Sequence, residues 1–228
     1  MHLLAVETSG AHGGIALLDG GRLVEEVPLT EGLRHARDLV VAIAGACDRA
    51  AWDRRTLGVV AVSIGPGSFT GVRIAVTLAK MIAWDTGAKV VAVPSLRAMA
   101  ANAPADCGRI ACICDAKRGG LFASIFEPAG AGLQETFGPA LIEPEDLARR
   151  LARPAFVLGR GLIKAGAALA GFDLAPEPLW DIRPAVVGHL GWELHEQGRH
   201  ADPLRLEPVY IRPPEALEIW ERRERGKA

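Results

Sequence analysis

The first hundred residues alternate between short apolar runs and turn-forming residues. Three runs, LLAVET, GIALLD and RLVEEVPL, are separated by SGAHGG and by the Gly20-Gly21 pair. Short apolar runs joined by such turns predict three antiparallel strands. A helix from about Leu33 to Ala50 follows, then the strand GVVAVSI, a second helix from about Thr70 to Asp85 and the strand KVVAVP. Because the last two strands are apolar throughout, we expect them to be parallel and covered on both faces.

The same order of elements begins again after MAANAPADCG, near residue 100. RIACICDAKRG, GLFASIFEP and GLQETFGPALI predict three more strands, followed by the helix EPEDLARRL, the strand AFVLGRG and the helical run LIKAGAALAG. The first strands begin near Leu3 and Arg109 and the second near Ile15 and Leu121, at one common spacing. A period this long indicates paired α/β domains rather than a solenoid.

This duplicated βββαβα unit resembles the actin-like (ASKHA) fold, which is built from two RNase-H-like domains. We place the first domain at residues 1–104 and the second, reduced domain at 105–204. Residues 205–228 are predicted to form a C-terminal helix that packs back on the first domain through Trp220 and ends in a charged tail. Topology alone does not define a function.

Composition narrows the functional classes only slightly. The chain has 228 residues with 26 basic and 27 acidic side chains, a net charge of −1, so charge balance gives no reason to expect nucleic-acid or membrane binding. No signal peptide is evident and no apolar run reaches the roughly 20 residues of a membrane span, so we expect a soluble, cytoplasmic protein. Cys107, Cys112 and Cys114 lack the spacing of a zinc site, and we interpret them as small hydrophobic residues.

The stretch SIGPGSFTGVRIA, residues 63–75, has the composition of a phosphate-binding loop but matches no phosphate motif. It lacks the Lys-Ser/Thr of a P-loop, the third glycine of a dinucleotide fingerprint and the flanking glycines of a nucleophile elbow. Gly67 and Gly71 permit a tight turn, and Thr70 is suited to cap the following helix. An anion site and a purely structural turn explain this composition equally well.

Both predicted helices of the first domain are apolar nearly all round, whereas a helix on a sheet needs only one apolar stripe. Either the rest of the chain buries them or another protein covers them, and we favour a partner interface. The residues assigned to this interface are His35, Leu39, Ala42, Ile43, Ala46, Val72, Arg73, Val76 and Lys80. A charge at Ala42 or Val76 is then expected to prevent complex formation without unfolding the chain.

Several segments in the order found here resemble the TsaB (YeaZ) family: LLAVETS, EGLRHARDL, GPGSFTGVRIAVTLAK, PSLRAMA, CDAKRGGLFAS and PVYIRPPEA. The resemblance covers the whole chain. It implies an actin-like fold and a role in forming threonylcarbamoyladenosine (t6A) beside the anticodon of tRNA. It further implies a heterodimer with the transferase TsaD, the ATPase TsaE in a larger complex, indirect contact with tRNA, and a homodimer when the chain is alone.

The residues that an enzyme of this fold would need are incomplete. TsaD-type relatives hold a metal with an H-x3-H pair, but here His35 is followed four residues later by Leu39. Where actin-like kinases have D-x-G-[ST], this chain has Glu7, Thr8, Ser9 and Gly10. We therefore interpret Glu7, Thr8, Ser9, Gly65, Gly67, Ser68 and Thr70 as degraded phosphate loops and assign no catalytic residue, metal or cofactor. The alternative is an active phosphotransferase or metallopeptidase of the same fold.

Overall fold

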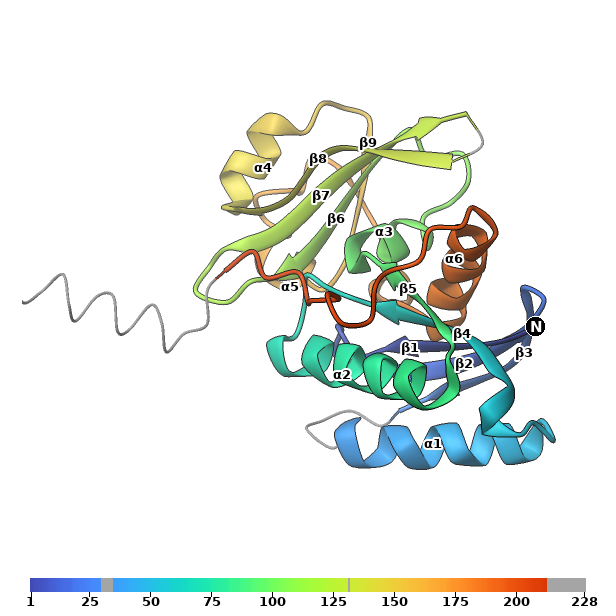
Figure 1. Cartoon of the computed structure of the whole chain (residues 1–228). Coiled ribbons are helices and arrows are strands. Elements are labelled where there is room, and N and C mark those ends of the chain that lie inside the picture. Colours follow the sequence, from blue (N-terminus) through green and yellow to red (C-terminus); the bar gives the residue numbers. More distant parts are fainter. Residues whose placement is uncertain (30–34, 131, 213–228) are drawn as a thin grey trace, which may run out of the picture.

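The computed structural model describes residues 1–29, 35–130 and 132–212, without the side chains of residues 35–37. Two five-stranded sheets lie one above the other with helices between them and on their outer faces (Figure 1). The first sheet consists of β1 (His2–Glu7), β2 (Gly14–Asp19), β3 (Arg22–Pro28), β4 (Leu57–Ser63) and β5 (Lys89–Val93). Its order is β3-β2-β1-β4-β5, with β1, β2 and β3 antiparallel and β4 and β5 parallel to β1.

The second sheet repeats this arrangement. It consists of β6 (Arg109–Asp115), β7 (Leu121–Ala129), β8 (Gly132–Ile142), β9 (Ala155–Leu158) and β10 (Asp173–Leu174), in the order β10-β9-β6-β7-β8. Strand β6 pairs antiparallel with β7 and parallel with β9, as β1 does with β2 and β4. The predicted duplication and the α/β actin-like fold are therefore confirmed.

The hydrophobic core consists of three layers, in which helices pack against the faces of the two sheets. Helices α1 (His35–Arg49) and α2 (Phe69–Thr86) cover the outer face of the first sheet, while α3 (Ser95–Ala100) and α6 (Pro184–Glu196) pack between the sheets. Helices α4 (Pro144–Arg150) and α5 (Leu162–Ala165) cover the outer face of the second sheet. The chain also contains two short 3-10 helices, Arg54–Thr56 and Glu177–Leu179. No helix in the described part of the chain is long and apolar enough to cross a membrane.

Helix α6 is absent from the sequence-based prediction, and its glycines explain why. Glycine lowers helix propensity by about 1 kcal/mol relative to alanine, so PAVVGHLGWELHE is a weak helix by composition. In the folded chain, a Cβ at Gly188 would overlap Leu18, and a Cβ at Gly191 would overlap Ala61. The glycines thus allow the helix to lie close against the first sheet, although it follows the last strand of the second.

Residues 201–212 form an irregular segment that returns to the first sheet. Ala201 bridges to Val90 of β5, and the Val209 amide donates to the Ile64 carbonyl at 2.7 Å. The C-terminal helix was predicted for residues 205–228; the described part, residues 205–212, is not helical, and the remainder with Trp220 lies outside the described residues. The division into domains at 104 and 204 stays a prediction.

Candidate functional site

A cleft of about 930 Å³ lies between the two halves of the chain. Its walls come from segments that follow β1, β4, β6 and β9, and from residues 209–212. In open α/β sheets, ligands bind in the crevice beyond the carboxyl ends of the strands. The cleft is therefore the candidate binding site of the fold. Four of the seven residues that the sequence assigned to degraded phosphate loops line it: Ser9, Gly67, Ser68 and Thr70.

The glycine loop before α2 packs directly against the loop after β1. The Ser68 amide donates to the Ser9 carbonyl at 2.7 Å, and the Thr8 hydroxyl donates to the Gly71 carbonyl at 2.7 Å. A Cβ at Gly71 would overlap the Thr8 carbonyl oxygen. The predicted cap exists, but Ser68 rather than Thr70 makes it, because the Ser68 hydroxyl accepts from the Gly71 amide at 3.2 Å. The close packing of the two loops thus explains why residue 71 is a glycine.

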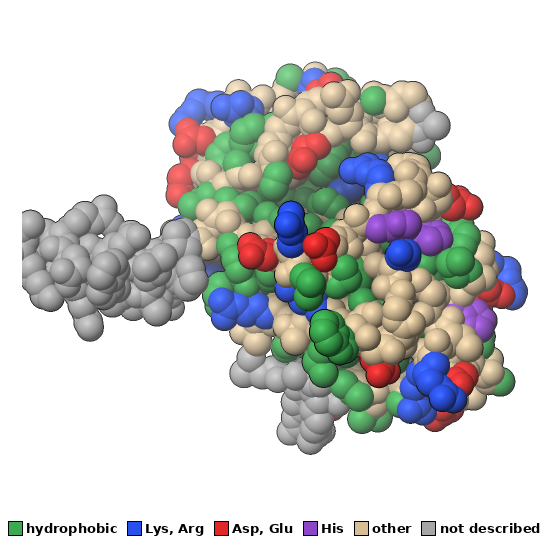
Figure 2. Space-filling view, viewed as in Figure 1, with side chains coloured by type: hydrophobic (Ala, Val, Ile, Leu, Met, Phe, Trp, Pro, Cys, Tyr) green, Lys and Arg blue, Asp and Glu red, His purple; other side chains and the backbone are tan. Residues whose placement is uncertain are grey.

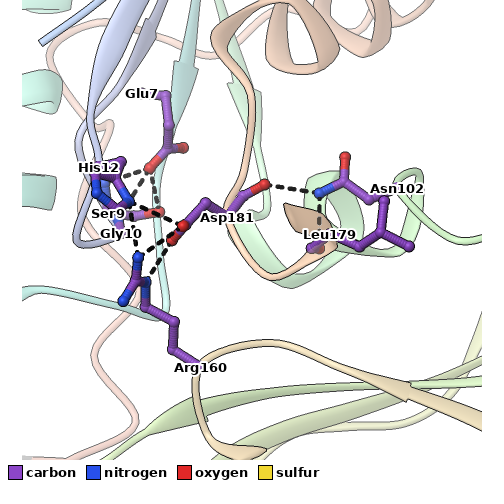
Figure 3. A network of polar contacts seen from close by, with 8 residues as sticks. All are labelled: Glu7, Ser9, Gly10, His12, Asn102, Arg160, Leu179 and Asp181. Carbon is purple, nitrogen blue, oxygen red and sulfur yellow. Dashed lines mark hydrogen bonds and ion pairs between the residues drawn. The ribbon is translucent and has the colours of Figure 1, made fainter. Parts of the chain in front are cut away.

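Glu7 is fully buried and held by its own turn. One carboxylate oxygen, Oε1, accepts from the Ser9 amide at 2.5 Å, the Ser9 hydroxyl at 2.7 Å and the Gly10 amide at 3.1 Å (Figure 3). Burial raises the pKa of Glu7, and the Ser63 and Ser9 hydroxyls with the nearby amides offset this only in part. Glu7 does not line the cleft and its side chain is fully buried, so a ligand in the cleft would not contact its carboxylate directly.

Asp115 occupies the position in the second sheet that Glu7 occupies in the first, at the end of the first strand. Its carboxylate accepts from Lys164 Nζ at 2.9 Å and from the Lys117 amide at 2.8 Å. Burial opposes ionisation, but these contacts prevail and the pKa of Asp115 lies below its ordinary value. Unlike Glu7, Asp115 lines the cleft as part of an ion pair.

A charged bridge joins the two halves across one side of the cleft (Figure 3). Arg160, which follows β9, donates from Nε and Nη2 to the two carboxylate oxygens of Asp181 at 2.7 and 2.9 Å. His12, in the loop after β1, lies with its Nδ1 2.9 Å from Asp181 Oδ2. Asn102 donates to the carbonyls of Leu179 and Asp181. These contacts hold three segments that are distant in sequence at one place.

Residues 209–212 form a further wall of the cleft and connect it to α2. Arg73 of α2 lies 3.9 Å from the Phe69 ring centroid and donates to the Tyr210 hydroxyl at 2.7 Å. Arg212 donates to the Ala116 carbonyl at 2.6 Å, in the turn after β6. The C-terminal segment thus links α2 to the second sheet.

The structure buries most of the side chains that were predicted to form a partner interface. Five of the nine are buried, namely Leu39, Ile43, Ala46, Val72 and Val76, and all of these except Val72 belong to the core between the first sheet and its outer helices. Ala42 and Lys80 are half-buried and Arg73 is exposed, while His35 opens α1 but its side chain is not described. Burial within the chain, the alternative weighed from the sequence, therefore accounts for much of the apolar character of these helices.

Other apolar side chains of the same two helices face outward. Val40 and Val41 of α1 are 57% and 69% exposed, and Met81 and Trp84 of α2 are 64% and 83% exposed. We call these four residues the outer face. Figure 2 shows hydrophobic side chains at the surface over α2, while charged side chains form small mixed groups elsewhere on that side. The sequence showed that both helices are unusually apolar, but it did not show which side of each helix faces the sheet.

The described residues contain no group of three or more histidine, cysteine or acidic side chains arranged to hold a metal. The residue four after His35 is Leu39, which is 1% exposed in the core. His195 Nδ1 and His200 Nε2 lie 2.9 Å apart at the surface as a pair. The bridge of His12, Arg160 and Asp181 gives no signal in the sequence, because these residues lie up to 169 positions apart and match no motif.

Comparison with known proteins relates the chain to two different proteins, TsaD and TsaB. Residues 27–175 match the sequence family described as TsaD, tRNA N6-adenosine threonylcarbamoyltransferase. The chain is 32% identical to the tRNA threonylcarbamoyladenosine biosynthesis protein TsaB of Bacillus subtilis (strain 168), over 96% of this chain and 98% of that protein.

Two solved structures from Pseudomonas aeruginosa share the fold. One is YeaZ, with a TM-score of 0.76 and 24% identity, and the other is an uncharacterized protein with similarity to peptidase YeaZ, with a TM-score of 0.77 and 23% identity. Each comparison covers 92% of this chain and 99% of the solved one. With the duplicated fold and near-complete coverage of its TsaB relative, the chain belongs to the TsaB (YeaZ) family.

Proposed function

We propose that this chain is a non-catalytic subunit that binds and activates a TsaD-type transferase in t6A formation, at the tRNA adenosine beside the anticodon. The name of its B. subtilis relative supports the pathway. The outer face supports the binding role, because four large apolar side chains stay exposed on two adjacent helices. In this proposal the complex is cytoplasmic, also takes up the ATPase TsaE, and reaches tRNA through its other subunits.

The condition of the phosphate loops supports the non-catalytic part of the proposal. Glu7 is the residue that would manage a metal-bound nucleotide, but its side chain is fully buried and its Oε1 already accepts three hydrogen bonds from Ser9 and Gly10. The loop after β1 also occupies the space beside the N-terminus of α2 through the Thr8 and Ser9 contacts. Purified chain alone is expected to show neither ATP hydrolysis nor threonylcarbamoyl transfer, and either activity at the rate of a complete complex would overturn this part.

The residues of the outer face allow a rough estimate of the free energy of binding to TsaD. Burying one large apolar side chain contributes about 1.5–3 kcal/mol, and aromatic residues at the centre of an interface contribute the most. Trp84 is the largest and most exposed residue of the four. Replacing it with glutamate removes this contribution and places a charge in the contact, so affinity for TsaD should fall at least about 100-fold.

The test uses the full chain and its TsaD counterpart, followed by titration calorimetry and by light scattering on a sizing column. Trp84→Glu should abolish the heterodimer while leaving the thermal unfolding of the chain unchanged. Leu141→Glu is the matched control, since Leu141 is a half-exposed apolar residue in the second sheet. Wild-type affinity in Trp84→Glu would reject this surface. A homodimer of the chain alone that also dissociates in Trp84→Glu would show that the same face serves self-association.

A further inference from the structure

Two histidine side chains meet at the surface where α6 ends. His195 lies in the last turn of α6, and His200 follows shortly after the helix ends at Glu196. The two ring centroids are 5.0 Å apart, and Nδ1 of His195 lies 2.9 Å from Nε2 of His200. Residues five positions apart do not share a face of a helix. The path of the chain after α6 must therefore bring these two rings together.

The turn at the end of α6 explains how the rings meet. The Gly198 amide donates to the His195 carbonyl at 2.9 Å, and the Arg199 amide donates to the Leu194 carbonyl at 2.9 Å. With a φ of 71° at Gly198, these two hydrogen bonds form a Schellman motif. The motif reverses the chain at the helix end and returns His200 to the last turn of α6.

The surroundings of the pair are fixed on both sides. Directly after His200, the Ala201 amide donates to a backbone carbonyl of β5 at 2.8 Å. The Trp192 ring lies beside the His195 ring, with centroids 5.3 Å apart. A Cβ at Gly21 would overlap the Trp192 ring, so this ring is packed against the turn between β2 and β3. A pair that is positioned before its ligand arrives loses less conformational freedom on binding.

The distance between the two nitrogens suits two ligands of one metal ion. Imidazole nitrogens bind zinc at about 2.0–2.1 Å, so two of them at right angles around a metal lie about 2.9 Å apart. Imidazole is a ligand of zinc, copper, iron and nickel, whereas magnesium takes oxygen ligands. The hydrogen bond between the rings contains one proton. When a metal takes its place, that proton moves to the other nitrogen of its ring, and both rings stay neutral.

We propose that His195 and His200 form a binding site for a divalent transition metal ion such as Zn²⁺ or Ni²⁺. The two imidazoles supply two nitrogen ligands, and water fills the other positions, since His200 is exposed. The bound ion ties the last turn of α6 to the segment that returns to β5. The site contains none of the residues of the outer face and does not depend on the proposed role with TsaD.

The test is titration calorimetry of the full, untagged chain at pH 7.5 with ZnCl2, NiCl2 and MgCl2 in separate experiments. Zn²⁺ and Ni²⁺ should each bind one ion per chain with a Kd of about 10 µM, and Mg²⁺ should not bind. His195→Ala and His200→Ala should each weaken binding at least about tenfold, because loss of a ligand costs no less than loss of a residue that supports one. His189→Ala is the matched control, since His189 is an exposed histidine of the same helix, and it should leave the Kd unchanged.

His200→Ala keeps the test decisive if His195→Ala lowers the melting temperature, because an exposed side chain can be removed with little effect on the fold. Zn²⁺ should raise the melting temperature of the wild-type chain more than that of His200→Ala. Absence of saturable binding of Zn²⁺ and Ni²⁺ up to about 0.5 mM would overturn the proposal. Wild-type affinity in both histidine variants would also overturn it, because the metal would then lie elsewhere. In every case the affinity for TsaD measured above is a separate result.

Discussion

Gly71→Ala distinguishes the two interpretations of the glycine loop. Gly71 lies in the first turn of α2, where alanine normally stabilises a helix by about 1 kcal/mol. Here an added Cβ would overlap the Thr8 carbonyl oxygen, which is backbone and cannot rotate away. Overpacking costs about 1–3 kcal/mol, and loss of the Thr8–Gly71 hydrogen bond costs about 1 kcal/mol more.

The net expectation is a destabilisation of about 2 kcal/mol, which corresponds to a melting temperature about 6 °C lower in a chain of this size. Gly108→Ala is the control, because no atom lies within 4 Å of a Cβ built there and its backbone is not left-handed. Calorimetry or circular dichroism measures both variants at pH 7. An unchanged or higher melting temperature for Gly71→Ala would refute loop packing as the reason for this glycine and would favour close approach of a ligand instead.

Three further predictions concern the effects of burial and of ionisation on stability. Val76→Asp should lower the free energy of unfolding in urea by about 4 kcal/mol, because Val76 lies in the core and is only 4% exposed. A charge at Val76 therefore does not leave the fold intact, contrary to what the sequence suggested. Trp84→Glu should stay within about 0.5 kcal/mol of wild type in the same assay, and equal losses in both would contradict the assigned burial. Since the pKa of Glu7 is raised in the folded chain, ionisation of Glu7 opposes folding as pH rises from its ordinary value of 4.5 through the raised value. Glu7→Gln should therefore gain stability relative to wild type over that interval, and a difference independent of pH would show that the carboxylate does not titrate there. At Asp181, burial opposes ionisation but Arg160 and His12 lower its pKa below 3.8, so its contribution is present above pH 3.8 and is lost as pH falls through the lowered value. Asp181→Asn should lower stability by about 2 kcal/mol at pH 7, and a gap to wild type that does not narrow in acid would exclude the ion pair as the cause.

The fold class followed from the sequence because strand and helix periodicity are local properties. The repeated order of apolar runs around Leu3 and Arg109 was enough to predict two related sheets, and their hydrogen-bonded order confirms it. The longest element that the sequence did not predict was α6, whose glycines weaken the local helix signal; the short α3 and β10 were not predicted either. Those glycines are explained only by contact with Leu18 and Ala61, which lie more than a hundred residues earlier.

Some features of the candidate site could also be identified from the sequence, and others only from the tertiary structure. The sequence alone identified the glycine loop, the altered acid at Glu7 and the unusually apolar helices, because residue type and spacing suffice for each. Only the tertiary structure decided which apolar positions are core and which are surface, so Val76 is buried while Trp84 faces outward. It also brought His12, Arg160 and Asp181 together and gathered five cations around one cleft. The physical reason is that burial and electrostatic contact depend on distances in space. Folding brings together residues that are far apart in the sequence, and no local periodicity in the sequence reports those distances.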